Sequence, residues 1–404
     1  MGRIPPELID NIIDFLHDDL EALRECCTVS SAWVASSRYH LFSHVTLHHH
    51  PDFLGPSNVT DCHRLYRVVE GTPQIIQYIK HLVIHNGYSR GVNEDRSLPL
   101  LLRALSSIQS LEINPGQFVR SSVVWSEDFL EAIASAISCK SFYKLRIHAS
   151  TFNHPISILQ MLRSCKELKD LHLTNIGFLP WTQNPVPSAI LAHTSDDESE
   201  SGKGRIRVLS LDHPVIAGCL LHSLSPVDVS DIRELTIKIY GEFAGADAKL
   251  LSSTPQVERL EVTLMTDISE ESLLDLSGNA QLKYLVLEVP VLLDRFDPLP
   301  WLFALFASIP AVNSLEEIAL TATIDLPPPH LTLPVYQDSL DGWKSIDSLL
   351  VDPKFSALRR IRLDFALDNP IEDQIVPTII DDILSQFQEL DNRGILYVDT
   401  CEIR

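Results

Sequence analysis

One short pattern of apolar positions recurs through most of the chain. An apolar residue is followed by two variable positions, a second apolar residue, one variable position and a third apolar residue, as in Ile79-x-x-Leu82-x-Ile84. Alternation over the last three positions is typical of a β-strand with one buried face. Eleven copies occur, the last one shortened, and their middle residues are Leu82, Leu111, Leu145, Leu171, Leu209, Leu235, Leu260, Leu285, Ile318, Ile361 and Leu396.

The segments between these predicted strands have helical spacing. We expect helices over residues 127–138, 155–168, 270–276, 298–309 and 376–387. Successive middle residues are separated by 25 to 43 positions. A strand and a helix at so short a period indicate stacked units whose apolar faces are covered only by their neighbours. The alternative is an ordinary α/β domain with leucine-rich strands.

This pattern resembles that of leucine-rich repeats, whose period is about 20–29 residues. The resemblance implies a solenoid over residues 78–404, with a curved parallel sheet and outer helices. Such repeats usually have Asn or Cys shortly after the strand; Asn86, Asn114 and Asn175 stand near that place, but several copies have none. We therefore expect an irregular solenoid, with insertions near residues 180–205 and 325–345.

The first 47 residues follow a different pattern and predict a small unit of three helices. Pro5 precedes an apolar stripe at helical spacing, and proline suits the first turn of a helix. Asp18 and Asp19 favour the start of a second helix, and Ser30 is an N-cap residue for a third. Residues 48–77 then form a linker or helical cap.

Proline at the start, the stripe Ile12-Ile13-x-x-Leu16 and the segment Val29-Ser30-x-x-Trp33 follow one another in the N-terminal unit. With these motifs the unit resembles the F-box, the adaptor-binding module of modular ubiquitin ligases. Two departures from the family are Ile4, where a leucine is usual, and Ala32, where a basic residue usually precedes the tryptophan. An F-box followed by leucine-rich repeats is similar to the large F-box sets of basidiomycete fungi. The resemblance rests on the segments Ile4-Pro5-Pro6-Glu7-Leu8-Ile9, Ile12-Ile13-Asp14-Phe15-Leu16, Asp19-Leu20 with Leu23, and Val29-Ser30-Ser31-Ala32-Trp33.

The F-box resemblance implies two partners, a Skp-type adaptor and, through it, a cullin scaffold. A small helical unit with apolar residues on more than one face can complete its burial against such a partner. The same side chains could instead form only the core of the unit and its seam with the first repeat. The implied adaptor-binding residues are Pro5, Leu8, Ile12, Leu16, Leu20, Leu23 and Trp33.

Composition and charge exclude several functional classes. The 404 residues include 32 Lys and Arg against 54 Asp and Glu, a net charge of −22, which argues against a nucleic-acid binder and against docking on an anionic membrane. Seven cysteines without CxxC spacing indicate reduced thiols, and no apolar run approaches the ~20 residues of a membrane span. We expect a cytoplasmic or nuclear protein.

No constellation of residues predicts catalysis, a metal site or a cofactor. His44, His48, His49 and His50 invite a metal interpretation, but alternation around them favours a solvated strand end, and no Cys or carboxylate stands at ligand spacing. The GxSxG, HExxH and Walker A motifs are absent. We expect a non-catalytic protein.

The leading hypothesis is a substrate receptor of a ubiquitin ligase, which presents a protein target on the outward side of its strands. The alternative is a leucine-rich-repeat interaction scaffold without any link to ubiquitin, and a third possibility is a small-molecule pocket in the repeat face. The acidic segment 364–404, with a charge of −8, would favour a basic target. The predicted target-binding residues are His81, His85, Glu112, Arg146, His148, His172, Lys238, Glu261 and Glu288, beside Val83, Thr236, Thr263 and Val286.

Overall fold

The structure is a computed structural model with mixed helices and strands, and it divides into two compact units. Unit 1 comprises residues 1–205 with 224–227, and unit 2 comprises residues 206–223 with 228–404. The structure describes residues 4–48, 60–85, 95–114, 124–178, 203–222, 225–240, 244–265, 274–292, 297–325, 336–367 and 375–399. Most of the two expected insertions lies outside these ranges.

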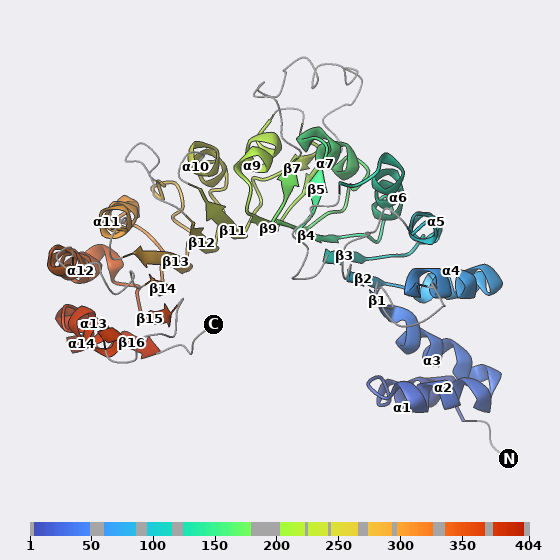
Figure 1. The fold of residues 1–404 in the computed structure, drawn as a ribbon. Coiled ribbons are helices and arrows are strands. Elements are labelled where there is room, and N and C mark those ends of the chain that lie inside the picture. Colours follow the sequence, from blue (N-terminus) through green and yellow to red (C-terminus); the bar gives the residue numbers. More distant parts are fainter. Residues whose placement is uncertain are drawn as a thin grey trace. The chain divides into compact units, whose positions relative to one another are not determined.

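Unit 1 contains three N-terminal helices followed by a parallel sheet in the order β1-β2-β3-β4-β6, with helices between its strands (Figure 1). The short strands β5 and β7 form a separate parallel pair. The elements are α1 (Pro6–Asp14), α2 (Leu20–Val29), α3 (Ser31–Ser43), β1 (His44–His48), α4 (Asp61–Gly71), the 3-10 helix η1 (Pro73–Tyr78), β2 (His81–His85), α5 (Ser97–Ala104), β3 (Ser110–Asn114), α6 (Glu127–Ile137), β4 (Lys144–His148), β5 (Thr151–Phe152), α7 (Pro155–Leu162), β6 (Asp170–Thr174), β7 (Gly177–Phe178) and β8 (Gly204–Arg205).

Unit 2 contains a second run of parallel strands, in the order β9-β11-β12-β13-β14-β15-β16. Strand β10 (Val227–Asp228) lies where the chain passes between the units. The elements are β9 (Val208–Leu211), α9 (Pro214–Leu220), β11 (Glu234–Ile239), α10 (Ala244–Ser252), β12 (Arg259–Leu264), β13 (Tyr284–Leu292), α11 (Leu299–Ser308), β14 (Glu317–Asp325), α12 (Tyr336–Leu350), η4 (Pro353–Phe355), β15 (Arg360–Leu367), α13 (Ile375–Leu384), α14 (Gln388–Asn392) and β16 (Leu396–Asp399).

The register of the strands follows the sequence pattern. All eleven predicted strands are present, and within each unit the middle apolar residues lie directly opposite one another. In unit 1 Leu82 pairs with Leu111, which pairs with Leu145. A one-residue slip would turn every buried side chain outward, so burial of these residues fixes the register.

Strand β1 was expected from the alternation around His44 and His48, and it is also a twelfth copy of the pattern, which was not counted among the eleven. Val45 pairs with Leu82, and Phe42-x-x-Val45-x-Leu47 has the required spacing. Leu47 is buried and Val45 is half-buried. The first strand of the sheet therefore follows directly on the third N-terminal helix.

Successive copies begin with the same backbone hydrogen bonds. The carbonyl oxygen of Lys80 accepts the N–H groups of Gln109 (2.7 Å) and Ser110 (3.0 Å) of the next copy. In unit 2 the carbonyl oxygen of Glu258 accepts the N–H groups of Lys283 (2.8 Å) and Tyr284 (3.0 Å) in the same way. Backbone geometry, which does not depend on side-chain identity, thus repeats from copy to copy.

Side chains just before the strands also connect neighbouring copies. Ser107 Oγ donates to the carbonyl of Ile76 (3.0 Å), and Ser141 Oγ donates to that of Ile108 (3.1 Å). In unit 2 the buried Asn279 Nδ2 donates to the carbonyl of Thr254 (2.9 Å). Connecting asparagines are expected after the strands, whereas these bonds come from the segment before them.

Most predicted helices are confirmed, with shorter ends. The helices expected over residues 127–138, 298–309 and 376–387 are α6, α11 and α13. The helix expected over residues 155–168 ends at Leu162 because Leu168 is buried as the first apolar residue of the next copy, so the chain must leave the helix before it. Residues 274–276 are not helical, and the rest of that prediction lies outside the described residues.

Candidate functional site

The three N-terminal helices begin where the sequence predicted and are joined by polar contacts. Asp19 accepts the N–H groups of Glu21 and Ala22 at the start of α2, and Ser30 accepts that of Ala32 at the start of α3. Helix α1 is fixed to α3 at two points one turn apart. The hydroxyl of Ser36 donates to the carboxylate of Asp10, and His40 Nε2 lies 2.8 Å from Asp14 Oδ1.

The core of this helical module is small. Ile9, Ile13 and Leu23 are buried together, and Leu16, Trp33 and Leu41 pack against them with part of their surface exposed. Leu23 has no exposed surface. It is therefore a core residue, and its predicted role as an adaptor contact is corrected because a partner cannot reach its side chain in this conformation.

A second side of α1, next to the buried one, is apolar and exposed to solvent. Ile4 is 51% exposed, Leu8 52%, Ile12 43% and Phe15 88%. Leu8, Ile12 and Phe15 follow one another at helical spacing, so their side chains form one stripe along α1, and Ile4 precedes the helix. Leu20, at the start of α2, is also 51% exposed. We call these five residues the apolar stripe.

The sequence predicted part of the apolar stripe. Leu8, Ile12 and Leu20 were expected as adaptor contacts, and the structure exposes all three together with Pro5. Ile4 and Phe15 were quoted only as part of the family resemblance. The spacing of Phe15, three residues after Ile12, was the signal that could have placed it on the same face of the helix.

The predicted target-binding residues of unit 1 lie on the outward side of its sheet. The strand pairing puts Glu112 beside Arg146 and Arg146 beside His172 in one row. His85 and His148 belong to the row at the ends of the strands. None of these five side chains is buried.

Ring stacking and hydrogen bonds connect neighbouring side chains on the outward side of this sheet. The rings of His44 and His81 stack at 4.3 Å between centroids, and His81 Nδ1 lies 2.8 Å from the hydroxyl of Ser110. Burial lowers the pKa of His81, and so do the charges of His44 and Lys144. His81 is thus favoured in the neutral state near neutral pH.

The carboxylate of Asp170 lies close to two basic side chains. Asp170 Oδ2 lies 3.0 Å from Lys144 Nζ, and Asp170 Oδ1 lies 2.5 Å from His172 Nε2. Burial raises the pKa of Asp170, but hydrogen bonds and charges from His172 and Lys144 outweigh it, and the pKa is lowered. Asp170 is ionised at neutral pH and orients both neighbours.

The predicted target-binding residues of unit 2 form a separate set on its own strands. Lys238 pairs with Thr263, which pairs with Glu288, and the hydroxyl of Thr263 donates to Glu288 Oε2 at 3.2 Å. Glu261 lies in the adjacent row. This set mixes both signs of charge with neutral side chains.

The described residues hold no group of three or more His, Cys, Asp or Glu side chains that could bind a metal ion. His48 stacks on His85 at 5.1 Å, and His49 and His50 lie outside the described residues. Burial raises the pKa of the thiols of Cys62 and Cys165, the latter to about 12, so both are protonated at neutral pH. In the part of the chain that the structure describes, no helix is long and apolar enough to cross a membrane.

Comparison with known proteins adds no relative. No protein-family model matches the chain, and no curated protein matches it.

Proposed function

We propose that the protein is the substrate-recognition subunit of a Skp-cullin-F-box type ubiquitin ligase. The apolar stripe on α1 and α2 is the observation that carries this proposal. Leu8, Ile12 and Phe15 form an exposed apolar stripe on a helix whose Ile9 and Ile13 are already packed in the core. Such a face is stabilised by a partner that covers it.

The parallel strands of each unit support the second half of the proposal, a leucine-rich-repeat-like solenoid. Middle residues such as Leu235, Leu260 and Leu285 lie in register, and the same backbone bonds join successive copies. Stacked repeats of this kind leave the outward strand residues free for a protein target.

In this proposal the protein contributes binding and leaves the chemical step to other subunits of the complex. The F-box-like helices would hold the adaptor, and the strand face would hold the target. Holding the two together raises the effective concentration of a target lysine near a ubiquitin thioester that is made elsewhere in the complex. The expected contribution of this chain is therefore affinity and geometry.

A direct binding experiment tests the proposal. Purified Skp-type adaptor is titrated against the full chain by calorimetry, with wild type and the Leu8→Asp/Ile12→Asp variant. Burying a Leu or Ile side chain contributes roughly 1.5–3 kcal/mol, and burying an unpaired carboxylate costs more. We expect the double variant to bind the adaptor at least ~100-fold more weakly.

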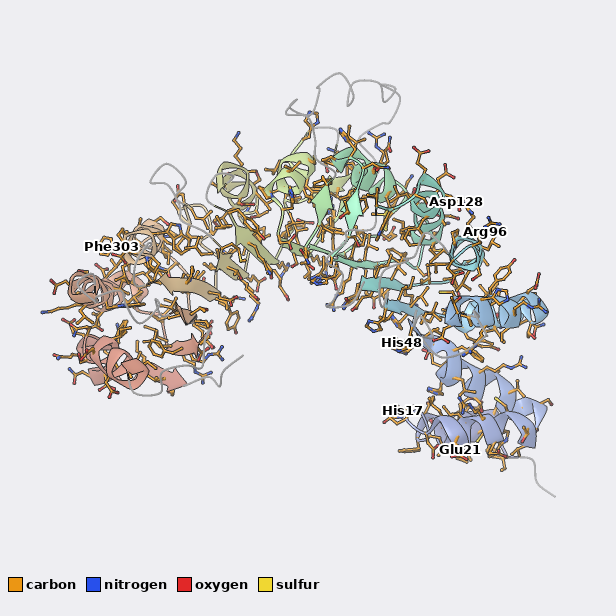
Figure 2. All side chains as sticks on the ribbon, in the orientation of Figure 1. His17, Glu21, His48, Arg96, Asp128 and Phe303 are labelled. Carbon is orange, nitrogen blue, oxygen red and sulfur yellow. The ribbon has the colours of Figure 1, made fainter. Side chains whose placement is uncertain are left out.

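The matched control is Phe303→Asp on α11 (Figure 2). Phe303 is as exposed as Ile12, 43% in each case, but lies on a helix of unit 2. We expect this variant to bind the adaptor like wild type. A folded wild-type protein that does not bind the adaptor would overturn the proposal, and so would equal losses in Ile12→Asp and Phe303→Asp.

A repeat scaffold with no ligase link is the second candidate, and one observation favours it. Helix α3 contacts η1 and β1, so the N-terminal helices also cover the first strand of the sheet, as a capping unit would. This role uses α3 and leaves the apolar stripe on α1 unexplained. Retained target binding without adaptor binding would support the scaffold.

A further inference from the structure

The outward strand face of unit 1 is unusually rich in histidine. It contains His44 and His48 on β1, His81 and His85 on β2, His148 on β4 and His172 on β6. The pairing places these rings in three parallel rows, and no ring is buried. We call these six residues the histidine face.

The permanent charges on the same face cancel. Lys144 and Arg146 are the basic residues at outward positions of β1, β2, β3, β4 and β6, and Glu112 and Asp170 are the acidic ones. Arg146 Nη1 lies 3.8 Å from Glu112 Oε2, and Lys144 Nζ lies 3.0 Å from Asp170 Oδ2. With neutral histidines these outward strand positions carry no net charge, in a chain with a net charge of −22. The carboxylate of Asp61 on α4 borders them, since its Oδ2 accepts the N–H of His48 at 3.2 Å.

Protonation therefore changes this face from neutral to cationic. His44 stacks on His81 and His48 stacks on His85, with 4.3 Å and 5.1 Å between the ring centroids, so added charge would be concentrated on β1 and β2. Burial and the charges of His44, Lys144 and Lys80 lower the pKa of His81. Histidine is the type of side chain that gains a positive charge on mild acidification, so a fall in pH adds positive charge to this face.

We propose, resting on the receptor function above, that the histidine face binds an extended segment of the target rich in Asp and Glu, more tightly as pH falls. The neighbouring groups suit carboxylates, because the guanidinium side chain of Arg146 lies among the rings and is 41% exposed. Carboxylates placed among the rings also favour their charged form, so binding and protonation reinforce each other.

The dimensions suit a short extended segment. Five strands about 4.8 Å apart span about 19 Å, which about six extended residues cross at ~3.3 Å each. The three rows of side chains give such a segment contacts on successive strands. A basic segment, which the acidic residues 364–404 would favour, is the competing outcome.

The test measures fluorescence anisotropy of a labelled hexaglutamate peptide with the full chain, at about pH 6 and about pH 7.5. We expect about tenfold tighter binding at the lower pH, and no such change for hexalysine. The variant His48→Gln/His85→Gln/His148→Gln keeps polar side chains but removes three of the six rings, and we expect it to show a clearly smaller pH dependence. The matched control His17→Gln/His63→Gln replaces two exposed histidines outside the histidine face, on the α1–α2 turn and on α4, and we expect it to behave like wild type.

Three outcomes overturn the inference: no hexaglutamate binding by wild type at about pH 6, equal binding of hexalysine, or unchanged pH dependence in the triple variant. Adaptor titration of the same proteins separates this inference from the receptor function. A chain that binds the adaptor but not hexaglutamate overturns only the acidic target. A chain that binds hexaglutamate but not the adaptor overturns the receptor function, and the histidine face stands as a binding surface of a scaffold.

Discussion

Asp247 provides a test of the structure that does not depend on any partner. Its side chain lies on α10 and is 2% exposed, and its Oδ2 has no hydrogen-bond partner among the described residues. Burial raises the pKa of this carboxyl from 3.8 to about 7. The folded protein therefore keeps Asp247 protonated at a pH where the unfolded chain ionises it.

The sign of the effect on stability follows from proton linkage. Between about pH 4 and about pH 7 the folded state binds more protons at Asp247 than the unfolded state does, so the free energy of unfolding falls as pH rises. A difference of about three pKa units corresponds to about 4 kcal/mol. Wild type should lose this amount between about pH 4 and about pH 8, through Asp247 alone.

The variant Asp247→Asn removes the titrating group with little change of shape. We expect the variant and wild type to be similarly stable near pH 4, and the variant to be more stable by about 4 kcal/mol near pH 8. Urea unfolding followed by amide hydrogen exchange in peptides of unit 2 measures this difference within the unit that contains Asp247.

Asp341→Asn is the control, because Asp341 is an exposed aspartate on α12 in the same unit. We expect this variant to follow wild type at every pH. A constant difference between wild type and Asp247→Asn over the whole pH range would refute the reasoning, since it would mean that Asp247 is ionised in the folded state.

Two further predictions concern capping and packing. Asp347 on α12 accepts the N–H groups of Glu389 (2.9 Å) and Leu390 (3.0 Å) at the start of α14. We therefore expect Asp347→Ala to lower the free energy of unfolding by about 2–3 kcal/mol. An unchanged midpoint of urea unfolding would contradict this capping role. Leu23→Ala should lower the free energy of unfolding of the helical module by about 3 kcal/mol, because Leu23 is fully buried. Leu20→Ala should lower it by less than about 0.5 kcal/mol, because Leu20 is exposed. Equal losses in thermal unfolding would show that the core is misassigned.

The strands could be predicted well because their signal is local and repeated. Each copy needs an apolar residue at the same three positions. A strand that is ambiguous in one copy can therefore be placed by comparison with the other copies. The copy at Val45 was missed for the opposite reason: it follows α3 without a turn, so Phe42 was assigned to the end of the helical module. Residues at the junction of the helical module and the repeats fit both the helical and the strand pattern, so the sequence does not show where the helix ends.

Helix α1 shows what the sequence could not decide. Leu8, Ile9, Ile12, Ile13 and Leu16 cover more than one side of the helix, so their spacing predicts a helix without saying which side is buried. Tertiary contacts settle it: Asp10 and Asp14 bind α3, which turns Ile9 and Ile13 inward and Leu8 and Ile12 outward. The polar pair on α1 thus selects the face that remains available to a partner, and Leu23 enters the core as a consequence of that choice.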